Sequence, residues 1–337
     1  MLSSIPSPSS NTMPVIGLHY YGVMIALGVL AAVMLARARW RAAGHDPDEI
    51  ADIAVWAVPA GLIGTRVYHV ITDFDKYRDN LGQIFAIWNG GLGIPGGILF
   101  GVIAGVWAAR HYGIDVNRVA DACIPGLPLA QAIGRLGNYF NQELFGRPTD
   151  VPWAIEIDPI HRPAQYVQFE TFHPTFAYEA LWNLGLCAAL ILVGRRKVLR
   201  PGKLLPLYLI GYGVGRFWVE LLRSDHATEI LGLRVNTWTS GAMVLIGFGW
   251  LLFGGALRPE AERGWDPEPE VAPEAEGVAG AAEGEGAAGA AGEAGVEGEA
   301  GVGSGPAEGA NDGVAEDGPQ GQGPVSEVEV PEADKPE

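Results

Sequence analysis

Charged and amide side chains interrupt an apolar stretch of the chain between Ala132 and Gly146, AIGRLGNYFNQELFG. Asn138 and Glu143 follow Arg135 at offsets of three and eight, which places them beside Arg135 on a continuous helix, while Asn141 turns further aside. A cation inside a membrane span costs roughly 2.5 to 3.5 kcal/mol. A guanidinium also binds phosphate through paired hydrogen bonds and keeps its charge when partly desolvated. This stretch therefore predicts a site for an anionic group.

The apolar segments of the chain predict an all-α polytopic membrane protein. About 20 apolar residues cross a bilayer, and seven segments meet that length within residues 15–258, after a short N-terminal segment of residues 1–14. No Lys or Arg precedes the first segment and three arginines follow it, which argues against a cleaved signal peptide. The predicted spans are Val15–Ala36, Ile50–Ile71, Gly90–Ala109, Val119–Phe140, Thr175–Gly194, Leu204–Leu222 and Thr237–Ala256.

The charge of the chain is divided unevenly between these spans and the C-terminal part. Residues 260–337 hold 21 acidic and 2 basic side chains out of totals of 39 and 22. The remainder therefore carries a small positive charge, although the whole chain has a net charge of −17. Residues 259–337 are rich in Gly, Ala, Glu and Pro and have few large apolar side chains, so we expect a disordered cytoplasmic tail. The composition of this tail does not indicate a binding partner.

The distribution of Lys and Arg over the loops predicts the orientation, because these residues accumulate on the cytoplasmic side. The loops after the first, third and fifth spans are rich in arginine and lysine, and the opposite loops are poor in them. The N-terminus is therefore expected outside and the acidic tail inside. The longest external connection, residues 141–174, contains Trp153 and an alternating AIEI segment. It predicts a small extracytoplasmic subdomain with some strand.

The depth of each polar side chain follows from this topology. At 1.5 Å per residue, Arg66 and Arg135 lie about 24 Å, and Arg216 about 18 Å, from the inner ends of their spans. All three arginines are therefore expected in the outer half of the membrane. The same half is expected to hold His19, Tyr20, Tyr21, the glycines between Gly90 and Gly97, His173, Tyr178 and Glu179, whereas Asp52 and Asp121 are exceptions.

This one-sided arrangement bears on the class of protein. A transporter needs polar groups through the whole membrane depth, often at the midplane of repeated halves, and the sequence has no internal repeat. A binding protein or transporter for an anionic lipid or solute is the alternative function. An intramembrane protease is disfavoured because no span carries a GxSx serine or a facing pair of carboxylates. A cluster of arginines on one side favours an anionic head group as ligand.

Several motifs resemble those of the prolipoprotein diacylglyceryl transferase family. Its signature GRxGNFxNxExxG is matched at seven positions, with Tyr139 in place of Phe. The resemblance extends over all seven spans and leaves out only the first dozen residues and the tail. The matching residues are Gly134, Arg135, Gly137, Asn138, Asn141, Glu143 and Gly146; His19, Tyr21 and Gly22; TRVYH around Arg66; His173 to Glu179 in HPTFAYE; and Arg216 to Glu220 in RFWVE.

This resemblance implies a transferase of the bacterial cytoplasmic membrane. It implies that the diacylglyceryl group of phosphatidylglycerol moves to the thiol of a lipobox cysteine in a prolipoprotein signal peptide, with release of glycerol 1-phosphate. We expect no cofactor, no metal and no nucleic-acid partner, and the two cysteines, Cys123 and Cys187, lack metal-ligand spacing. The expected catalytic residues are Arg135, Arg216, Glu143 and Glu220; phosphatidylglycerol is expected at Arg135, Asn138, Asn141, Tyr21, Arg66 and Gly146; secondary candidates are His19, His69, His173, Tyr178 and Glu179.

One position departs from the family pattern. Many members carry a histidine in the glycine-rich entry of the third span, often assigned as the catalytic base, whereas this chain has Pro95 before Gly96 and Gly97. The base cannot be carried over to this chain. Other roles stay open for several of these residues. Arg216 and Glu220 are four residues apart and could form a plain ion pair. Glu143 could orient Arg135 or cap a helix end, and His19 and His69 could be interfacial histidines.

Overall fold

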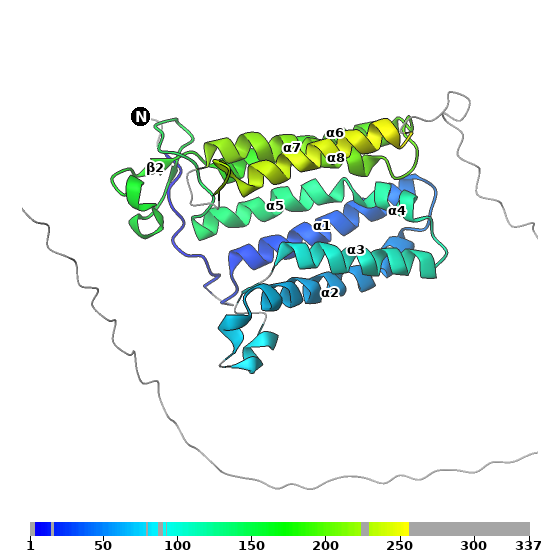
Figure 1. Ribbon diagram of the computed structural model, residues 1–337, viewed down its shortest axis with the longest axis horizontal. Helices are drawn as coiled ribbons and strands as arrows, with labels where there is room; N and C mark the ends of the chain where they lie inside the picture. The colour runs from blue at the N-terminus through cyan, green and yellow to red at the C-terminus, as the bar shows by residue number, and fades with distance from the viewer. Residues whose placement is uncertain are drawn as a thin grey trace, which may run out of the picture. The chain divides into compact units, whose positions relative to one another are not determined.

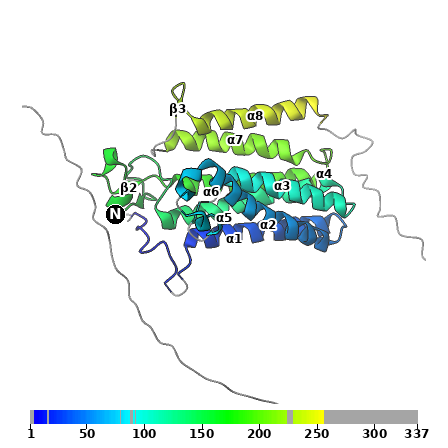
Figure 2. The same cartoon turned by 60° about the horizontal axis from the view of Figure 1, so that its bottom comes forward.

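The computed structural model describes residues 4–14, 17–78, 80–86, 90–91, 93–223 and 229–255, and the predicted acidic tail lies outside them. Long helices lie side by side in one bundle (Figure 1). Helix α5 packs against α1 and α6, and α7 packs against α8 at one edge of the bundle (Figure 2). The helices are α1 (Tyr20–Ala42), α2 (Pro47–Thr72), α3 (Ile94–His111), α4 (Val116–Cys123), α5 (Gly126–Asn141), α6 (Thr175–Arg195), α7 (Leu204–Leu222) and α8 (Val235–Phe253).

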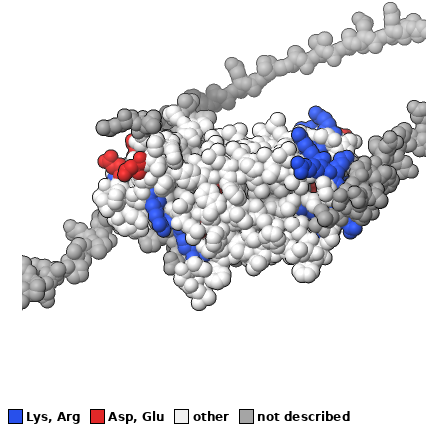
Figure 3. Space-filling model, turned by 90° about the horizontal axis from the view of Figure 1, so that it is seen from above, with Lys and Arg blue, Asp and Glu red and all other residues white. Residues whose placement is uncertain are grey.

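The composition of these helices is that of a membrane protein. Among the described residues, five helices are long and apolar enough to cross a bilayer: α1, α2, α3, α6 and α8. Lys and Arg gather at the two ends of the bundle, and the surface between them is nearly free of charge on the face that Figure 3 shows. The mainly helical architecture agrees with the predicted helical membrane protein, while five of the seven predicted spans have a matching apolar helix among the described residues.

The ends of the helices differ from the predicted spans where local chemistry decides them. Helix α2 begins three residues earlier than expected because the Asp46 side chain accepts a hydrogen bond from the Asp48 amide (2.9 Å) and Pro47 occupies the first turn. Helix α1 begins at Tyr20 instead of Val15 and continues to Ala42. His19 therefore precedes the helix.

The fourth predicted span is divided into two helices, which corrects the expectation of one continuous helix from Val119 to Phe140. Helix α4 ends at Cys123 and α5 begins at Gly126, because Pro125 has no amide hydrogen to continue the ladder. The Asp121 carboxylate, an exception to the outer polar cluster, accepts hydrogen bonds from the amides of Gly202 (2.8 Å) and Leu204 (3.1 Å). It caps the start of α7.

Close backbone contacts fix α5 against α1. A Cβ atom on Gly28 would lie 2.9 Å from the Ala130 carbonyl oxygen, and one on Gly126 would lie 3.0 Å from that of Ala32. Further along, a Cβ atom on Gly137 would lie 2.7 Å from the Tyr21 ring. Small residues let two helices approach in this way without side chains between them, so the polar face of α5 is held in one orientation.

The connection between α5 and α6, residues 142–174, forms a small structural unit that contains two short strands and is called the subdomain below. Its strands β1 (Ile155–Glu156) and β2 (Thr171–Phe172) pair antiparallel, and Ile5 pairs with Ile155 on the other side. Two short 3₁₀ turns, Pro159–His161 and Ala164–Tyr166, lie between the strands. The apolar core consists of Phe145, Ile155, Ile157, Phe172 and Phe176.

The N-terminal segment of residues 4–10 is anchored to this subdomain. The Ser7 hydroxyl donates to the Asp158 carboxylate (2.8 Å), and Ser4 donates to Glu156. The Gln142 amide also donates to Asp158 (2.6 Å). These hydrogen bonds hold the pKa of Asp158 below its ordinary value. The described N-terminal residues from Ser4 onward thus pack as part of the fold.

A second hairpin precedes α8. Its strands β3 (Glu229–Ile230) and β4 (Leu233–Arg234) place Arg234 directly before the first turn of that helix. The remaining short elements are the turns η1 (Phe74–Tyr77) and η2 (Leu81–Phe85), which follow α2. These connections lie at the same end of the helices as the subdomain (Figure 1).

Candidate active site

One buried carboxylate joins the two arginines that the sequence singles out. Arg135 on α5 donates from Nη2 to Glu179 Oε1 at 2.6 Å, and Arg216 on α7 donates from Nη1 to Glu179 Oε2 at 3.1 Å. The Glu179 side chain, from the second turn of α6, is only 4% exposed. Three helices that are separate in sequence thus meet at a single charged cluster.

A second carboxylate holds Arg216 from the other side. Glu220 Oε2 lies 3.0 Å from Arg216 Nη2, one helical turn away on α7. Arg234 Nε lies 3.0 Å from Glu220 Oε1, and Arg223 Nη1 lies 3.7 Å from Glu220 Oε2. Asn236 also donates to this carboxylate at 3.2 Å. Glu220 is fully buried and contacted by protein groups on both oxygens.

Arg135 and Arg216 are the two guanidiniums that share the Glu179 carboxylate. Because a guanidinium stays protonated in proteins, both keep their positive charge at any ordinary pH. Fixed cations in this position can stabilise a phosphate that gains negative charge.

Glu143 forms a neighbouring group with the two asparagines of the signature. Asn138 Nδ2 donates to Glu143 Oε1 at 2.7 Å, and Asn141 Nδ2 donates to the same oxygen at 3.0 Å. Arg135 Nη1 approaches Asn138 Oδ1 at 3.4 Å, so the group adjoins the arginine cluster. The chain turns back here because Gln142 and Leu144 adopt left-handed backbone conformations, with φ of 50° and 55°. Glu143 remains partly exposed.

Tyr21 and Gly146 lie beside these groups. Tyr21 packs against Gly137 in the turn between Arg135 and Asn138. The Gly146 amide donates to the His173 carbonyl (2.8 Å), and a Cβ atom on Gly146 would lie 2.8 Å from the Leu222 carbonyl oxygen. Gly146 therefore allows the loop after α5 to lie directly against the end of α7.

Arg66 is engaged elsewhere, although the depth estimate places it level with Arg135. Its guanidinium donates all five N–H groups to backbone carbonyls of the segment between α2 and α3. A fully occupied guanidinium has no donor left for a phosphate. The acceptors are the carbonyl oxygens of Gln83, Ile84, Ala86, Gly90 and Gly91.

The candidate histidines lie in three different surroundings. His19 is exposed before α1, and His69 Nδ1 lies 3.3 Å from the Asp73 carboxylate. His173 Nδ1 lies 3.0 Å from the Tyr178 hydroxyl, which also accepts from Trp153 Nε1 at 2.8 Å. These contacts join His173 and Tyr178 to the subdomain and not to the carboxylates of the cluster.

Three residues of the cluster are not among the site residues that the sequence predicts. Arg223 follows Arg216 by seven residues and therefore shares its helix face, a signal that was present in the sequence. Arg234 and Asn236 lie outside the predicted spans and far from Glu220 in sequence, and no spacing points to them. Glu179 was expected only as a secondary candidate, although it is the carboxylate that joins Arg135 to Arg216.

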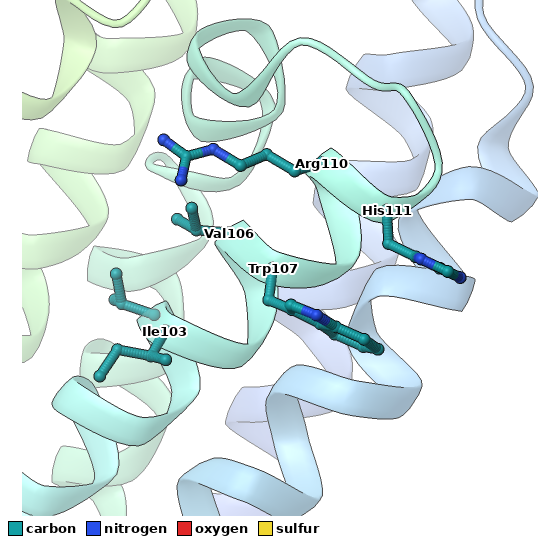
Figure 4. A pocket seen from close by; sticks show the side chains of 6 residues that line it. Ile103, Val106, Trp107, Arg110 and His111 are labelled. Carbon is teal, nitrogen blue, oxygen red and sulfur yellow. The ribbon is translucent and has the colours of Figure 1, made fainter.

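A hollow of about 840 Å³ is lined by mostly apolar side chains of α1, α5, α6 and the subdomain. Its lining includes Tyr178, one of the secondary candidates, and Leu136, which follows Arg135 in sequence. A second hollow of about 570 Å³ lies along the last turns of α3, where Trp107, Arg110 and His111 project (Figure 4). It contains none of the predicted site residues. Of these two hollows, the first contains one of the candidate residues, Tyr178.

Comparison with known proteins identifies the family. Residues 9–253 match the family model described as prolipoprotein diacylglyceryl transferase. The chain is 49% identical over 252 residues to a phosphatidylglycerol–prolipoprotein diacylglyceryl transferase of Frankia alni, a match covering 73% of this chain and 66% of the relative. It is 43% identical over 277 residues to the Streptomyces griseus protein of that name, covering 81% and 84%, and 47% identical over 251 residues to a Streptomyces coelicolor one, covering 73% and 79%. On this evidence the chain belongs to the prolipoprotein diacylglyceryl transferase family.

Proposed function

We propose that this transferase moves the diacylglyceryl group of phosphatidylglycerol to a prolipoprotein cysteine at the cluster formed by Arg135, Glu179 and Arg216. The observation that carries the proposal is the shared Glu179 carboxylate, which holds two guanidiniums from two helices next to each other. The leaving group of this reaction is a phosphate, and the transition state is stabilised by fixed cations placed where its charge develops. No cofactor is required.

The proposed step is a displacement at carbon. The cysteine sulfur forms a bond to the carbon of the diacylglyceryl group that carries the phosphate. The bond between that carbon and the phosphate oxygen breaks. The products are a thioether and glycerol 1-phosphate. Arg135 and Arg216 stabilise the departing phosphate, while Asn138, Asn141 and Tyr21 hydrogen-bond the glycerol or ester oxygens. The thiol proton goes to the partly exposed Glu143 or to water.

Two carboxylates and one arginine take positioning roles in this scheme. Glu179 and Glu220 are too enclosed to meet a thiol and instead set the angle between the guanidiniums. Arg66 holds the segment between α2 and α3 through its five carbonyl acceptors and stabilises that part of the fold. Gly146 keeps the α5 and α7 ends in contact.

The apolar hollow lined by Leu136 and Tyr178 is proposed as the lateral entrance for the membrane-held substrates. These are phosphatidylglycerol and a signal peptide with a lipobox cysteine, and both reach the protein from within the bilayer. Leu136 (48% exposed) and Leu181 (68% exposed) line the hollow and face outward, as a lipid-facing opening requires. An apolar lining beside a charged centre suits substrates with an apolar body and a polar reacting group.

The function is tested by mass spectrometry. Purified full-length protein is incubated with phosphatidylglycerol and a synthetic lipobox peptide. We expect the peptide to gain the mass of one diacylglyceryl group, and a peptide with Ser in place of Cys to gain none. An unmodified Cys peptide, with the lipid bound but unconsumed, would instead support the alternative of an anionic-lipid binding protein or transporter.

The orientation proposed for this protein has seven spans, with the divided α4–α5 segment and α7 crossing in addition to the five apolar helices. It places the N-terminus and the subdomain outside the cell and the arginine-rich loops inside. In a background with Cys123 and Cys187 replaced by Ser, Gln165→Cys is expected to react with a membrane-impermeant maleimide in intact cells. Arg196→Cys is expected to react only after lysis. The reverse pattern would invert the topology.

The proposed activation of the thiol needs no histidine, since proline occupies the position of the family histidine. A free cysteine is about 3% thiolate at neutral pH, and nearby guanidiniums lower its pKa by one or more units. We expect His19→Gln, His69→Gln, His161→Gln and His173→Gln each to keep at least about a tenth of the wild-type turnover.

These variants also identify a substitute base if the expectation is wrong. A general base typically contributes about 10² to 10⁴-fold. A roughly hundredfold loss in one variant, with folding and phosphatidylglycerol binding retained, would assign the base to that histidine and end the arginine-activation hypothesis.

A further inference from the structure

Two amide side chains, fully buried Asn183 and partly buried Gln131, lie one helical turn from residues of the charged cluster. Gln131 precedes Arg135 by one helical turn on α5, and Asn183 follows Glu179 by one turn on α6. Residues four apart share a helix face, and α5 and α6 run in opposite directions between the subdomain and the far end of the bundle. Both amides therefore occupy the layer next to the cluster, on the side away from the subdomain.

Polar atoms in this layer lack partners. Asn183 is completely buried, and neither its Nδ2 nor its Oδ1 has a hydrogen-bond partner among the described residues. The same holds for Gln131 Oε1 and Arg135 Nε, whereas Gln131 Nε2 donates to the Tyr208 hydroxyl at 2.8 Å. An unsatisfied buried polar group costs roughly 1 to 3 kcal/mol. Four such atoms next to a phosphate site point to a polar ligand.

The chemistry of these four atoms defines the ligand. Asn183 Nδ2 and Arg135 Nε are donors, and Asn183 Oδ1 and Gln131 Oε1 are acceptors. A hydroxyl both donates and accepts one hydrogen bond, so two hydroxyls match two donors and two acceptors. An ammonium group offers no acceptor and would be repelled by Arg135. The layer therefore suits a neutral diol.

We propose that Gln131, Asn183 and Arg135 Nε form a subsite for the head-group glycerol of phosphatidylglycerol, and that this amide subsite selects the lipid by its two hydroxyls. The inference rests on the proposed function and adds the residues that set its specificity. It also orders the substrate along the bundle: the reacting carbon lies towards the apolar hollow, the phosphate lies on the two arginines, and the leaving glycerol lies on the amides.

The test compares two lipids that differ only in the diol. Initial rates of peptide modification are measured for the full-length protein with phosphatidylglycerol and with phosphatidylpropanol, which has the same phosphodiester but no head-group hydroxyl. A site built for hydroxyls rejects an analogue that leaves its polar groups unpaired. We expect wild-type kcat/KM to favour phosphatidylglycerol by about 100-fold. In Asn183→Leu and in Gln131→Leu this preference should fall to about threefold or less.

The control is Cys187→Ala, which alters a buried side chain one turn beyond Asn183 on α6 and should keep the wild-type preference. If Asn183→Leu does not fold, Gln131→Leu on the neighbouring helix gives the same comparison. Equal use of both lipids by the wild type would overturn the subsite but leave the transferase function standing. An equal loss of kcat/KM with both lipids in the amide variants would also overturn the subsite and leave the transferase function standing. This is the result expected if the amides have a purely structural role or are hydrated. Transfer from neither lipid would reject the proposed function itself.

Discussion

Arg135→Lys and Arg216→Lys are each expected to lower kcat/KM for phosphatidylglycerol by about 100-fold or more, although the positive charge is retained. Arg135 donates to Glu179 from one nitrogen, and Arg216 contacts Glu179 and Glu220 from two, so the angle of both guanidiniums is fixed. An ammonium is a point charge on a flexible chain and reproduces neither contact. Removing one fixed donor from an anionic transition state typically costs about 10² to 10³-fold.

Steady-state kinetics of purified variants measure this effect, with circular dichroism as a check on folding. Arg110→Lys is the matched control, because this arginine lies in the last turn of α3 and outside the cluster. It should keep wild-type activity. If folded Arg216→Lys retained more than about half of the wild-type turnover, its role as a phosphate clamp would have to be withdrawn.

Glu179→Gln is expected to lower kcat by about 100-fold while changing KM for phosphatidylglycerol much less. The amide keeps the shape of the carboxylate but offers only one acceptor oxygen, so one of the two guanidiniums loses its partner. Both guanidiniums stay protonated, so we expect the site still to bind a phosphate. A displacement of about 1 Å in a catalytic group can nevertheless cost about 10²-fold.

The conservative variant Glu179→Asp keeps two oxygens on a shorter stem and should fall between wild type and Glu179→Gln. Asp52→Asn serves as the control, since Asp52 is an exposed carboxylate in α2. An unchanged kcat in Glu179→Gln would show that the arginines are oriented by something else. A large rise in KM with unchanged kcat would move Glu179 from positioning to lipid binding.

The positions of Arg135 and Arg216 illustrate what the sequence can predict. Span lengths give the depth of a residue, and these two arginines, expected in the same half of the membrane, do meet on one carboxylate. Arg66 has the same expected depth but its side chain is bound by a different segment. Depth follows from counting residues along a helix, whereas direction depends on how each helix is rotated against its neighbours, which the sequence alone does not reveal.

Other differences have local causes. The fourth span reads as continuous because its hydropathy averages over Pro125, and only the missing hydrogen bond divides it into α4 and α5. Arg234 enters the cluster through a hairpin that brings the start of α8 back to Glu220. Long-range contacts made by a turn leave no periodic signal in the chain, so the arginines next to Glu220 could be only partly foreseen.

The pairing of the N-terminal segment with the subdomain determines when in synthesis these contacts can form. Ser4 and Ser7 bond to partners 152 and 151 residues later in the chain. At a synthesis rate of about 5 to 20 residues per second, roughly 8 to 30 s pass before those partners exist. Ser4 and Ser7 must wait that long without these hydrogen bonds, while α1 to α5 are made. Both serines are thus synthesised well before the residues that hold them in the folded protein exist.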